Sequence, residues 1–498
     1  LSGADPLAPL AGLSKLETLT LQRVALADGE LASLAGLSGV RTLDLRYNAI
    51  ETVPDLNGLT ALASLHLHGN PVVETSSLAG RVLQTDLAPG DVNQAGTVAE
   101  LAAALHRLPI EMFQYVVNQF EYQPYPGSMK GPQAVLETGA GNDWDQAALL
   151  VALLDESGVA ARYASGRIDV EIPVVLDWLG VIGVDAAGTV LANAGLNPVR
   201  FLDAFDNPIF YRFDHTWVEA WLDVPGQGTQ WVALDPSWKF RDFQPGVPDI
   251  LANMPFDEAD YLSQVRAETA AEYYAQAVGE YLAANFGDVS LADVSYDGPI
   301  LPQVIDTLPS SLPYDVSGTP DIRTDIPLSM THRVRVVVQQ SGVDLIDQLL
   351  VLPEMGLQRV TISFAGDGDP LLCLDGDLLA RGDALFNGGD VQIYLYHYDP
   401  GDDDWDNGSG YVRSIGDYIA VGLDANQISQ AMLQRQWETV NEANIAALNG
   451  QAVAAEDQIG ALLALGILGY FYDTNAGEEL VDGLTHAVPV YARAASGL

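Results

Sequence analysis

The feature that most constrains the fold of this 498-residue chain is a short repeat close to its N-terminus. Three blocks, at residues 16–21, 40–45 and 62–67, share the pattern LxxLxL, with Val40 replacing the first Leu in the second block. Asn48 and Asn70 follow the second and third blocks at the same distance. The blocks start 24 and 22 residues apart. This period indicates stacked units, each contributing a short strand whose Leu side chains point into one shared core.

The pattern LxxLxLxxN resembles the leucine-rich repeat family. The resemblance implies a solenoid over residues 1–90, in which the Asn side chain bonds backbone groups of the adjacent turn. Val24 takes the Asn position in the first block, as expected of a terminal capping unit. Three repeats are close to the minimum for stability, so we expect the array to be stabilised by packing against the next domain. Two interpretations stay open: the concave face binds a protein or a glycan, or the array is a structural spacer.

Charge and composition exclude several classes of protein. The chain has 67 acidic and 22 basic residues, a net charge of −45, so it lacks the Lys and Arg that nucleic-acid binding needs. An anionic membrane surface is disfavoured for the same reason. Hydrophobic residues make up 48% of the chain, which excludes disorder as a description of the whole. The one cysteine, Cys373, excludes an internal disulfide, a Cys-rich zinc site and an iron–sulfur cluster.

The relative numbers of the charged residue types also indicate where such a protein works. Asp outnumbers Glu, and Lys15, Lys130 and Lys239 are the only lysines. An Asp-rich, Lys-poor surface stays hydrated at high salt, and we expect a secreted or cell-surface bacterial protein. No apolar run reaches the roughly 18 residues of a membrane span. The chain opens with Leu1 rather than Met and shows no signal peptide, so we expect a piece of a longer protein.

A different pattern begins near residue 98. Residues 98–106 and 109–120 are apolar at helical spacing. The block GNDWDQ at 141–146 leads into apolar residues up to position 154, which predict a buried helix, and residues 159–166 predict the strand after it. Two alternating, aromatic-rich strands are predicted at 214–221, which contains His215, and at 231–237, which contains Asp235.

These blocks resemble the bacterial transglutaminase-like domains, which belong to the papain-like class of thiol hydrolases and acyltransferases. The family pattern is GNCxDxAxLLxALL, then GxxARxVxG, HxWxE and WxxxDP, and the order and spacing match this sequence. The resemblance covers about residues 95–245 and implies a papain-like domain over 95–250. The region after it resembles segments of very large secreted bacterial proteins, some of which carry Rhs-type repeats.

One position departs from the family pattern. The nucleophilic Cys of the family starts the helix, where the helix dipole and a neighbouring His stabilise the thiolate. This sequence has Asp143 there. The resemblance gives His215 as the base and Asp235 as the residue that orients it. Cys373 lies far downstream in an apolar run that predicts a buried strand. We therefore expect no thiol acyl transfer from this chain.

Three roles for Asp143 stay open. Asp143 and Gln146 fit a capping box at the helix N-terminus, which would leave a dead site. Alternatively, Asp143 and Asp235 form a carboxylate pair with His215 and carry out general acid–base chemistry on a glycosidic bond. The third role is metal binding by both of these carboxylates with Asp145 and His215, a set that suits calcium, manganese or zinc.

Neighbouring residues are candidates for ligand binding. Trp144, beside the predicted site, is placed to line a cleft for a sugar or an aromatic side chain. Trp217 and Asp145 are further binding candidates. For Trp217 the alternative is packing within the core, and for Asp145 it is a helix position facing solvent or a partner.

The rest of the chain predicts accessory elements. An insertion at about 170–212, with helices near 174–179 and 190–194, is long enough to cover one face of the sheet. Residues 251–320 predict one long helix, over 257–285, and a Pro-rich linker. Residues 321–425 predict a β-rich, sandwich-like module, and the chain becomes helical again over 426–498.

An acidic loop precedes these last helices. Asp402, Asp404 and Asp406 are spaced like the start of a calcium loop, but Gly408 comes one place late and Arg413 takes the position of the usual Glu. The loop is therefore either a solvated turn or a weak calcium site, and no other cofactor is expected.

Together these patterns predict an α+β multidomain protein: a short leucine-rich repeat solenoid, a papain-like transglutaminase core, and a β-rich C-terminal module with flanking helices. The expected function is a non-catalytic one, in binding or assembly within a large secreted or cell-surface protein. Expected partners are a protein, a glycan, or further domains of the same polypeptide. The alternative is an active hydrolase or lyase on glycans or peptides that uses Asp143, His215 and Asp235.

Overall fold

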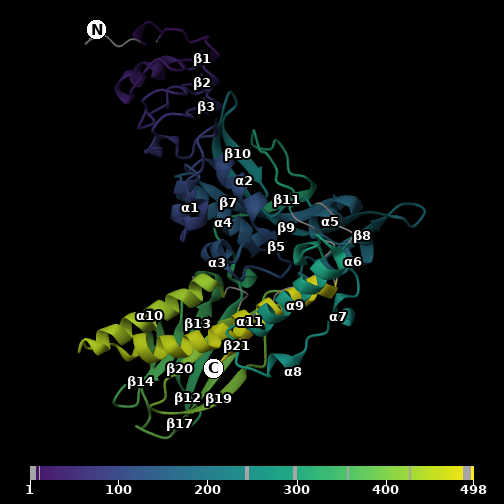
Figure 1. Cartoon of the computed structure of the whole chain (residues 1–498), viewed down its shortest axis with the longest axis vertical. Helices are drawn as coiled ribbons and strands as arrows, with labels where there is room; N and C mark the ends of the chain where they lie inside the picture. The colour runs from purple at the N-terminus through teal and green to yellow at the C-terminus, as the bar shows by residue number, and fades with distance from the viewer. Residues whose placement is uncertain are drawn as a thin grey trace.

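The computed structural model describes residues 7–10, 12–241, 246–294, 300–355, 358–424, 428–485 and 495–498. Figure 1 shows three parts along the long axis of the molecule: the N-terminal repeats at one end, a mixed domain in the middle, and a β module with two long helices at the other end. Residues 1–6 and 11 of the predicted repeat region, and residues 426, 427 and 486–494 of the predicted C-terminal helical region, lie outside the described residues.

The N-terminal repeats form one parallel sheet of four short strands in sequential order. Leu19, Leu43 and Leu65 occupy equivalent positions in the first three strands and are buried in one core. The sequence predicted three repeats, whereas the structure adds a fourth strand. The four strands are β1 (Thr18–Thr20), β2 (Thr42–Asp44), β3 (Ser64–His66) and β4 (Gln84–Thr85).

The array rests on the central domain. Leu108 of that domain is fully buried within the core of the repeats. The backbone N–H of Gly80 donates to the carbonyl of Arg107 (2.9 Å), and Nε of Arg107 donates to the carbonyl of Glu156 (3.2 Å). The last repeat is thus closed by apolar and polar contacts, because a short solenoid cannot bury its own ends.

The repeat Asn residues bond the turns, as the resemblance implies. Asn48 Nδ2 donates to the carbonyls of Leu21 (2.7 Å) and Leu45 (2.8 Å). Its Oδ1 accepts from the backbone N–H of Val24 (3.0 Å) and Leu26 (3.2 Å). One side chain therefore pairs four backbone groups that have no regular ladder partner.

The central domain is an antiparallel sheet with helices on both faces. The strand order is β10-β9-β7-β11. β8 pairs with the first residues of β9, 208–212, at the end away from the part that pairs with β10. Two short strands, β5 and β6, form a separate pair. The strands are β5 (Glu121–Tyr122), β6 (Ala140–Gly141), β7 (Ala161–Glu171), β8 (Val199–Leu202), β9 (Pro208–Val224), β10 (Gly228–Leu234) and β11 (Asp315–Arg323).

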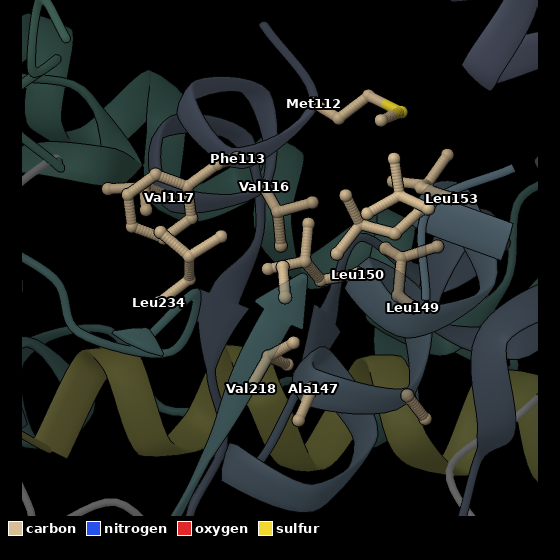
Figure 2. Packing of buried hydrophobic residues seen from close by; sticks show 14 of the residues in the cluster. Met112, Phe113, Val116, Val117, Ala147, Leu149, Leu150, Leu153, Val218 and Leu234 are labelled. Atoms are coloured by element: carbon tan, nitrogen blue, oxygen red, sulfur yellow. The ribbon is translucent and has the colours of Figure 1, made fainter. Parts of the chain in front are cut away.

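One face of this sheet carries the helices that come before it in the chain. Figure 2 shows side chains of α2 and α4 packed against Val218 of β9 and Leu234 of β10. Helix α4 is apolar on almost every side, which is the pattern of a helix buried within a domain. The helices are α1 (Val98–Ala104), α2 (Pro109–Gln119), α3 (Gly131–Thr138) and α4 (Asp143–Asp155).

The predicted insertion covers the other face. Helices α5 (Ile172–Leu179) and α6 (Val184–Asn193) pack on Tyr211, Phe213 and Trp217, which alternate along β9 with the residues that face α4. Among the described residues, no single helix is long and apolar enough to cross a membrane, and only the bent pair α5 and α6 reaches that length and composition together.

The region after β10 differs from its prediction. The single helix expected at 257–285 is two helices, α8 (Glu258–Tyr261) and α9 (Ala270–Phe286), preceded by α7 (Ile250–Asn253). Thr269 lies in the middle of the predicted helix. It is instead the N-cap of α9, in a capping box with Glu272.

The predicted Pro-rich linker is also part of the central domain. β11 adds to the edge of the central sheet beside β7, so residues 315–323 belong to that sheet rather than to a linker or to the β module. The β module starts at β12.

The β module consists of two five-stranded sheets whose inward side chains belong to one hydrophobic cluster. One sheet contains β12, β13, β17, β18 and β19, and the other contains β14, β15, β16, β20 and β21. The strands are β12 (Arg333–Gln340), β13 (Val343–Val351), β14 (Val360–Phe364), β15 (Pro370–Leu374), β16 (Asp377–Arg381), β17 (Asp390–Asp399), β18 (Asp404–Trp405), β19 (Ser409–Ser414), β20 (Ile419–Asp424) and β21 (Ala495–Gly497).

Two long helices, α10 (Gln430–Leu448) and α11 (Ala461–Thr485), pack together as a hairpin, and α11 lies on β20. In Figure 1 this hairpin is yellow-green to yellow and lies beside the β module.

Candidate functional site

The residues matched to the family's catalytic positions meet at one point in the central domain. Asp143 is the first residue of α4, His215 lies in β9, and Asp235 directly follows β10. His215 Nε2 lies 2.8 Å from Asp235 Oδ2, and His215 Nδ1 lies 3.4 Å from Asp143 Oδ2. The imidazole is therefore held between two carboxylates from different elements.

Asp143 does not cap its helix, so the predicted capping box is wrong. Asn142 takes the N-cap, with an extended backbone and with Oδ1 accepting from the backbone N–H of Asp145 (2.9 Å). Asp143 then lies inside the helix, and its Oδ2 accepts from the backbone N–H of Thr216 in β9 (2.8 Å). Gln146 instead donates to the carbonyls of Glu121 (2.9 Å) and Gly141 (2.8 Å).

Asp235 is positioned by two residues that the sequence analysis missed. Its Oδ1 accepts from the backbone N–H (2.9 Å) and the hydroxyl (2.7 Å) of Ser237. Its Oδ2 accepts from the hydroxyl of Tyr314 (2.9 Å) as well as facing His215. Ser237 had a local signal, because an Asp carboxylate commonly bonds the backbone two residues on. Tyr314 had none, since it is 79 residues away in the sequence.

The site is enclosed by aromatic rings. The side chains of Asp143, His215 and Asp235 are each at most 1% exposed. Edge-to-face contacts surround the imidazole, with ring centroids 5.3 to 6.2 Å from that of His215, and they come from Trp178, Phe213, Trp238 and Tyr314. This apolar wall strengthens the electrostatic interactions inside it.

Burial and charge split the pKa values of the two carboxyl groups. Burial raises the pKa of Asp143 to about 6, against the opposing effect of His215. Burial also raises the pKa of Asp235, but the charge and hydrogen bond of His215, with the bonds from Ser237 and Tyr314, bring it below the usual value. Burial lowers the pKa of His215, and the two carboxylates outweigh this, so its pKa is raised overall. The pKa of Asp143 is thus raised and that of Asp235 is lowered, so Asp143 takes up a proton at a higher pH than Asp235 does.

Several buried polar atoms around Asp143 lack a hydrogen-bond partner within the described part of the chain. Asp143 Oδ1 and His215 Nδ1 are two of them, and Gln146 Oε1, one turn along α4, is a third. The hydroxyl of Tyr122, which packs beside Trp178, is a fourth. Unsatisfied buried polar atoms are rare in folded proteins, and each costs about 1–3 kcal/mol.

Asp145 holds a loop rather than a ligand. It is fully buried, and its carboxylate accepts five hydrogen bonds of 2.6 to 3.1 Å from one loop. The donors are the hydroxyls of Tyr125 and Ser128 and the backbone N–H groups of Met129, Lys130 and Gly131. Asp145 therefore faces neither solvent nor the His215 site, which removes it from the metal set proposed for that site.

The two tryptophans singled out as binding residues are both buried. Trp144 packs on Tyr163 in the core between α4 and the sheet. Trp217 is 2% exposed and lies in the core beneath α5 and α6. Neither ring lines an open cleft in this structure, so packing describes both.

Two further motif residues form a structural pair. Nε and Nη2 of Arg162 in β7 donate to Glu219 Oε2 in β9 (2.8 and 2.6 Å), and the guanidinium stacks on Trp231 at 3.7 Å. These contacts join the three neighbouring strands β7, β9 and β10.

Lys239 caps a helix within the same domain. Its Nζ donates to the carbonyls of Val116 (2.9 Å) and Val117 (3.1 Å), in the last turn of α2, and to that of Pro236 (2.7 Å). Burial lowers the pKa of Lys239 to about 7. The side chain ties α2 to the segment after Asp235 and satisfies carbonyls that a helix end leaves open.

Among the described residues, no group of three or more His, Cys, Asp or Glu side chains is arranged to hold a metal ion. In the acidic loop, Asp404 and Asp406 accept from backbone N–H groups of the loop and of β17, as in a hydrogen-bonded turn.

Comparison with known families agrees with this geometry. Residues 96–236 match the transglutaminase-like superfamily, and residues 14–72 match the leucine rich repeat family. No curated protein and no solved structure matches the chain significantly. Asp143, His215 and Asp235 all lie within the first match, whereas Tyr314 lies outside it. The chain therefore contains a transglutaminase-like domain at residues 96–236, preceded by leucine-rich repeats at residues 14–72.

Proposed function

We propose that the transglutaminase-like domain has no thiol acyl-transfer activity and acts in binding or assembly within a large secreted or cell-surface bacterial protein. The observation that carries this proposal is that a carboxylate, Asp143, faces His215 at the start of α4. Thiol acyl transfer begins with attack by a thiolate that a neighbouring His stabilises, and this position holds no thiol.

The chain has no substitute for the missing thiol. Cys373 is its one cysteine and lies in β15 of the β module. Burial, with a smaller effect of Glu456, raises the pKa of Cys373 to about 11, so the thiol stays protonated at neutral pH. A protonated, buried thiol in another part of the fold cannot serve as the nucleophile.

The repeats support the binding role. Leucine-rich repeats commonly mediate protein interactions, and the sheet formed by β1 to β4 leaves polar side chains such as Thr18, Thr20 and His66 at least partly exposed. We propose a protein or a glycan as the partner, with further domains of the same polypeptide as the other candidate.

A second candidate function is a hydrolase or lyase that uses the carboxylates. The observation in its favour is the split between the pKa of Asp143, raised to about 6, and that of Asp235, lowered below its usual value. Two carboxyl groups with different protonation states are what general acid–base catalysis requires. The enclosed aromatic wall around His215 counts against it, because a substrate needs access to that point.

Amine incorporation into a glutamine peptide and ester hydrolysis test the first proposal. We expect the native chain to be inactive in both assays. Asp143→Cys restores a thiol opposite His215, and the double variant Asp143→Cys with His215→Ala is its matched control. Turnover by the native chain in either assay, lost in Asp143→Asn, would overturn the non-catalytic proposal. Release of sugar or peptide products by the native chain, abolished by Asp143→Asn, would establish the second candidate instead.

A further inference from the structure

A segment from outside the matched domain closes the site. Residues 300–314, here called the strap, run across the central domain and lead into β11. At its start, the backbone N–H of Leu301 donates to the carbonyl of Phe240 (2.7 Å). At its end, Tyr314 reaches Asp235 of the Asp143–His215–Asp235 site.

Tyr314 fills the space beside the imidazole. Its hydroxyl donates to Asp235 Oδ2 (2.9 Å), and its ring lies edge-on to His215 with centroids 5.4 Å apart. It also contacts Trp238 and Trp217, at centroid distances of 4.9 and 6.3 Å, and is only 9% exposed. The ring therefore forms part of the wall that separates His215 from solvent.

The strap is held by a few side-chain hydrogen bonds and by the partly buried side chains of Ile305, Leu308 and Leu312, which pack on the hydrophobic clusters of the central domain. Asn118 of α2 exchanges two bonds of 2.8 Å with the backbone N–H and carbonyl of Gln303. Gln114 Oε1 accepts from the backbone N–H of Ile305 (2.7 Å), and Gln84 of the repeats donates to Asp306 (2.9 Å). The strap has no helix or strand between residues 301 and 314, and the side chain of Val304 is 83% exposed. Segments with exposed, sparse hydrogen bonds are those that open most readily.

The closed state also carries a cost that opening would relieve. With the strap in place, Asp143 Oδ1 is buried without a hydrogen-bond partner among the described residues, and His215 Nδ1 makes no hydrogen bond but lies 3.4 Å from Asp143 Oδ2. Water admitted by a displaced strap would form hydrogen bonds with both atoms. The free energy of these bonds offsets part of the hydrophobic free energy that is lost when Tyr314 is exposed.

We propose that the strap is a displaceable cover of the Asp143–His215–Asp235 site, with Tyr314 as its plug and as a positioning residue for Asp235. The closed structure is then a latent state, and the site is reached when residues 300–314 leave the domain. This inference concerns access alone, so it holds whether or not the site performs chemistry.

The rate of thiol labelling measures this opening directly. Asp143→Cys places a reporter thiol at the site, and buried Cys373 of the β module serves as an internal monitor of unfolding. N-ethylmaleimide labelling of each position is followed by peptide mass spectrometry. Val304→Cys, on the exposed part of the strap, gives the reference rate of an open thiol.

Four second substitutions in the Asp143→Cys chain then separate the parts of the proposal. Tyr314→Ala removes the plug, and Tyr314→Phe keeps the ring but loses the bond to Asp235. Asn118→Ala releases the strap at a point that does not touch the site. Gln119→Ala, an exposed neighbour on α2, is the matched control for it.

We expect the reporter thiol to react at least a hundredfold more slowly than the reference thiol. Tyr314→Ala and Asn118→Ala each raise that rate at least tenfold, Tyr314→Phe and Gln119→Ala leave it within threefold, and Cys373 stays unlabelled throughout. We expect the pH dependence of the labelling rate to shift in Tyr314→Phe. Loss of the hydrogen bond to Asp235 changes how Asp235 interacts with His215, and His215 faces the reporter thiol.

Three results would overturn the proposal. The first is a reporter thiol that reacts as fast as the reference without any second substitution. The second is an unchanged rate in both Tyr314→Ala and Asn118→Ala. The third is labelling of Cys373 in parallel with the reporter, which would show that access comes from unfolding rather than from movement of the strap.

Discussion

Replacing Asp145 by Asn tests the conclusion that this carboxylate is a structural anchor. Asp145 Oδ2 accepts three of its five hydrogen bonds and Oδ1 accepts the other two. An amide can keep the three bonds on one oxygen, but its NH2 group then faces the backbone N–H of Gly131. The bond from Gly131 is lost, and the Ser128 hydroxyl can only accept from the NH2 group, so two charge-assisted bonds of about 1.5–3 kcal/mol each disappear. Asp145→Asn should therefore lower the free energy of unfolding by about 3–6 kcal/mol.

Tryptophan fluorescence during urea unfolding measures this loss, because six of the eight tryptophans lie between residues 144 and 238. Asp155→Asn, at the exposed end of the same helix, is the matched control, and we expect its effect to stay within about 0.5 kcal/mol. Amide hydrogen exchange of Met129, Lys130 and Gly131 should also accelerate by at least a hundredfold in Asp145→Asn. A variant with native stability and native exchange at these amides would refute the assignment of Asp145 as an anchor.

Three further predictions follow from the structure. Asn48→Ala removes the bonds to four backbone groups and should destabilise the repeats by about 2–3 kcal/mol in thermal unfolding, and a loss below about 0.5 kcal/mol would contradict this. Burial raises the pKa of Asp143 to about 6, so the folded chain binds this proton more tightly than the unfolded chain, and stability from this group falls as pH rises from 4 to 7. Relative to Asp143→Asn, the native chain should lose roughly 2 kcal/mol over that range in urea unfolding, and a constant difference would argue against it. His397 of β17 stacks on His332, with ring centroids 5.3 Å apart. Burial, with the charge of His332, lowers the pKa of His397 to about 4, so its protonation favours the unfolded chain. Stability relative to His397→Gln should therefore fall as pH drops from 6.5 to 4, and a difference independent of pH would count against this origin.

The positions of the site residues could be predicted in part from the sequence. His215 and Asp235 sit in motifs with fixed spacing on alternating strands, and the structure brings them within hydrogen-bond distance. The role of Asp143 could not be predicted, because N-cap and first-turn positions differ by a single residue. Asn142 takes the cap through its own backbone conformation, and that choice frees Asp143 to reach β9.

Secondary structure was predicted best where the pattern was long and local. The buried helix α4 and the alternating strands β9 and β10 follow their hydrophobic periodicity. The helix predicted at 257–285 failed because Thr269 caps α9 in the middle of an apparently continuous pattern. The fourth repeat strand, β4, was missed because its block lacks the full LxxLxL pattern and is completed by Leu83 and Leu108 packing in the same core.

By itself, the sequence determined the repeats, the buried helix, the two motif strands and the absence of a thiol at position 143, because each of these depends on residue identity and local spacing. Only the tertiary structure decided what surrounds the site. Tyr314 bonds Asp235 across 79 residues, and Asp145 turns away from His215 to hold a loop. Neither contact has a local signal, since both depend on how β11, the strap and the loop at residues 125–131 pack around α4. Packing over such distances is set by the whole core rather than by any one segment.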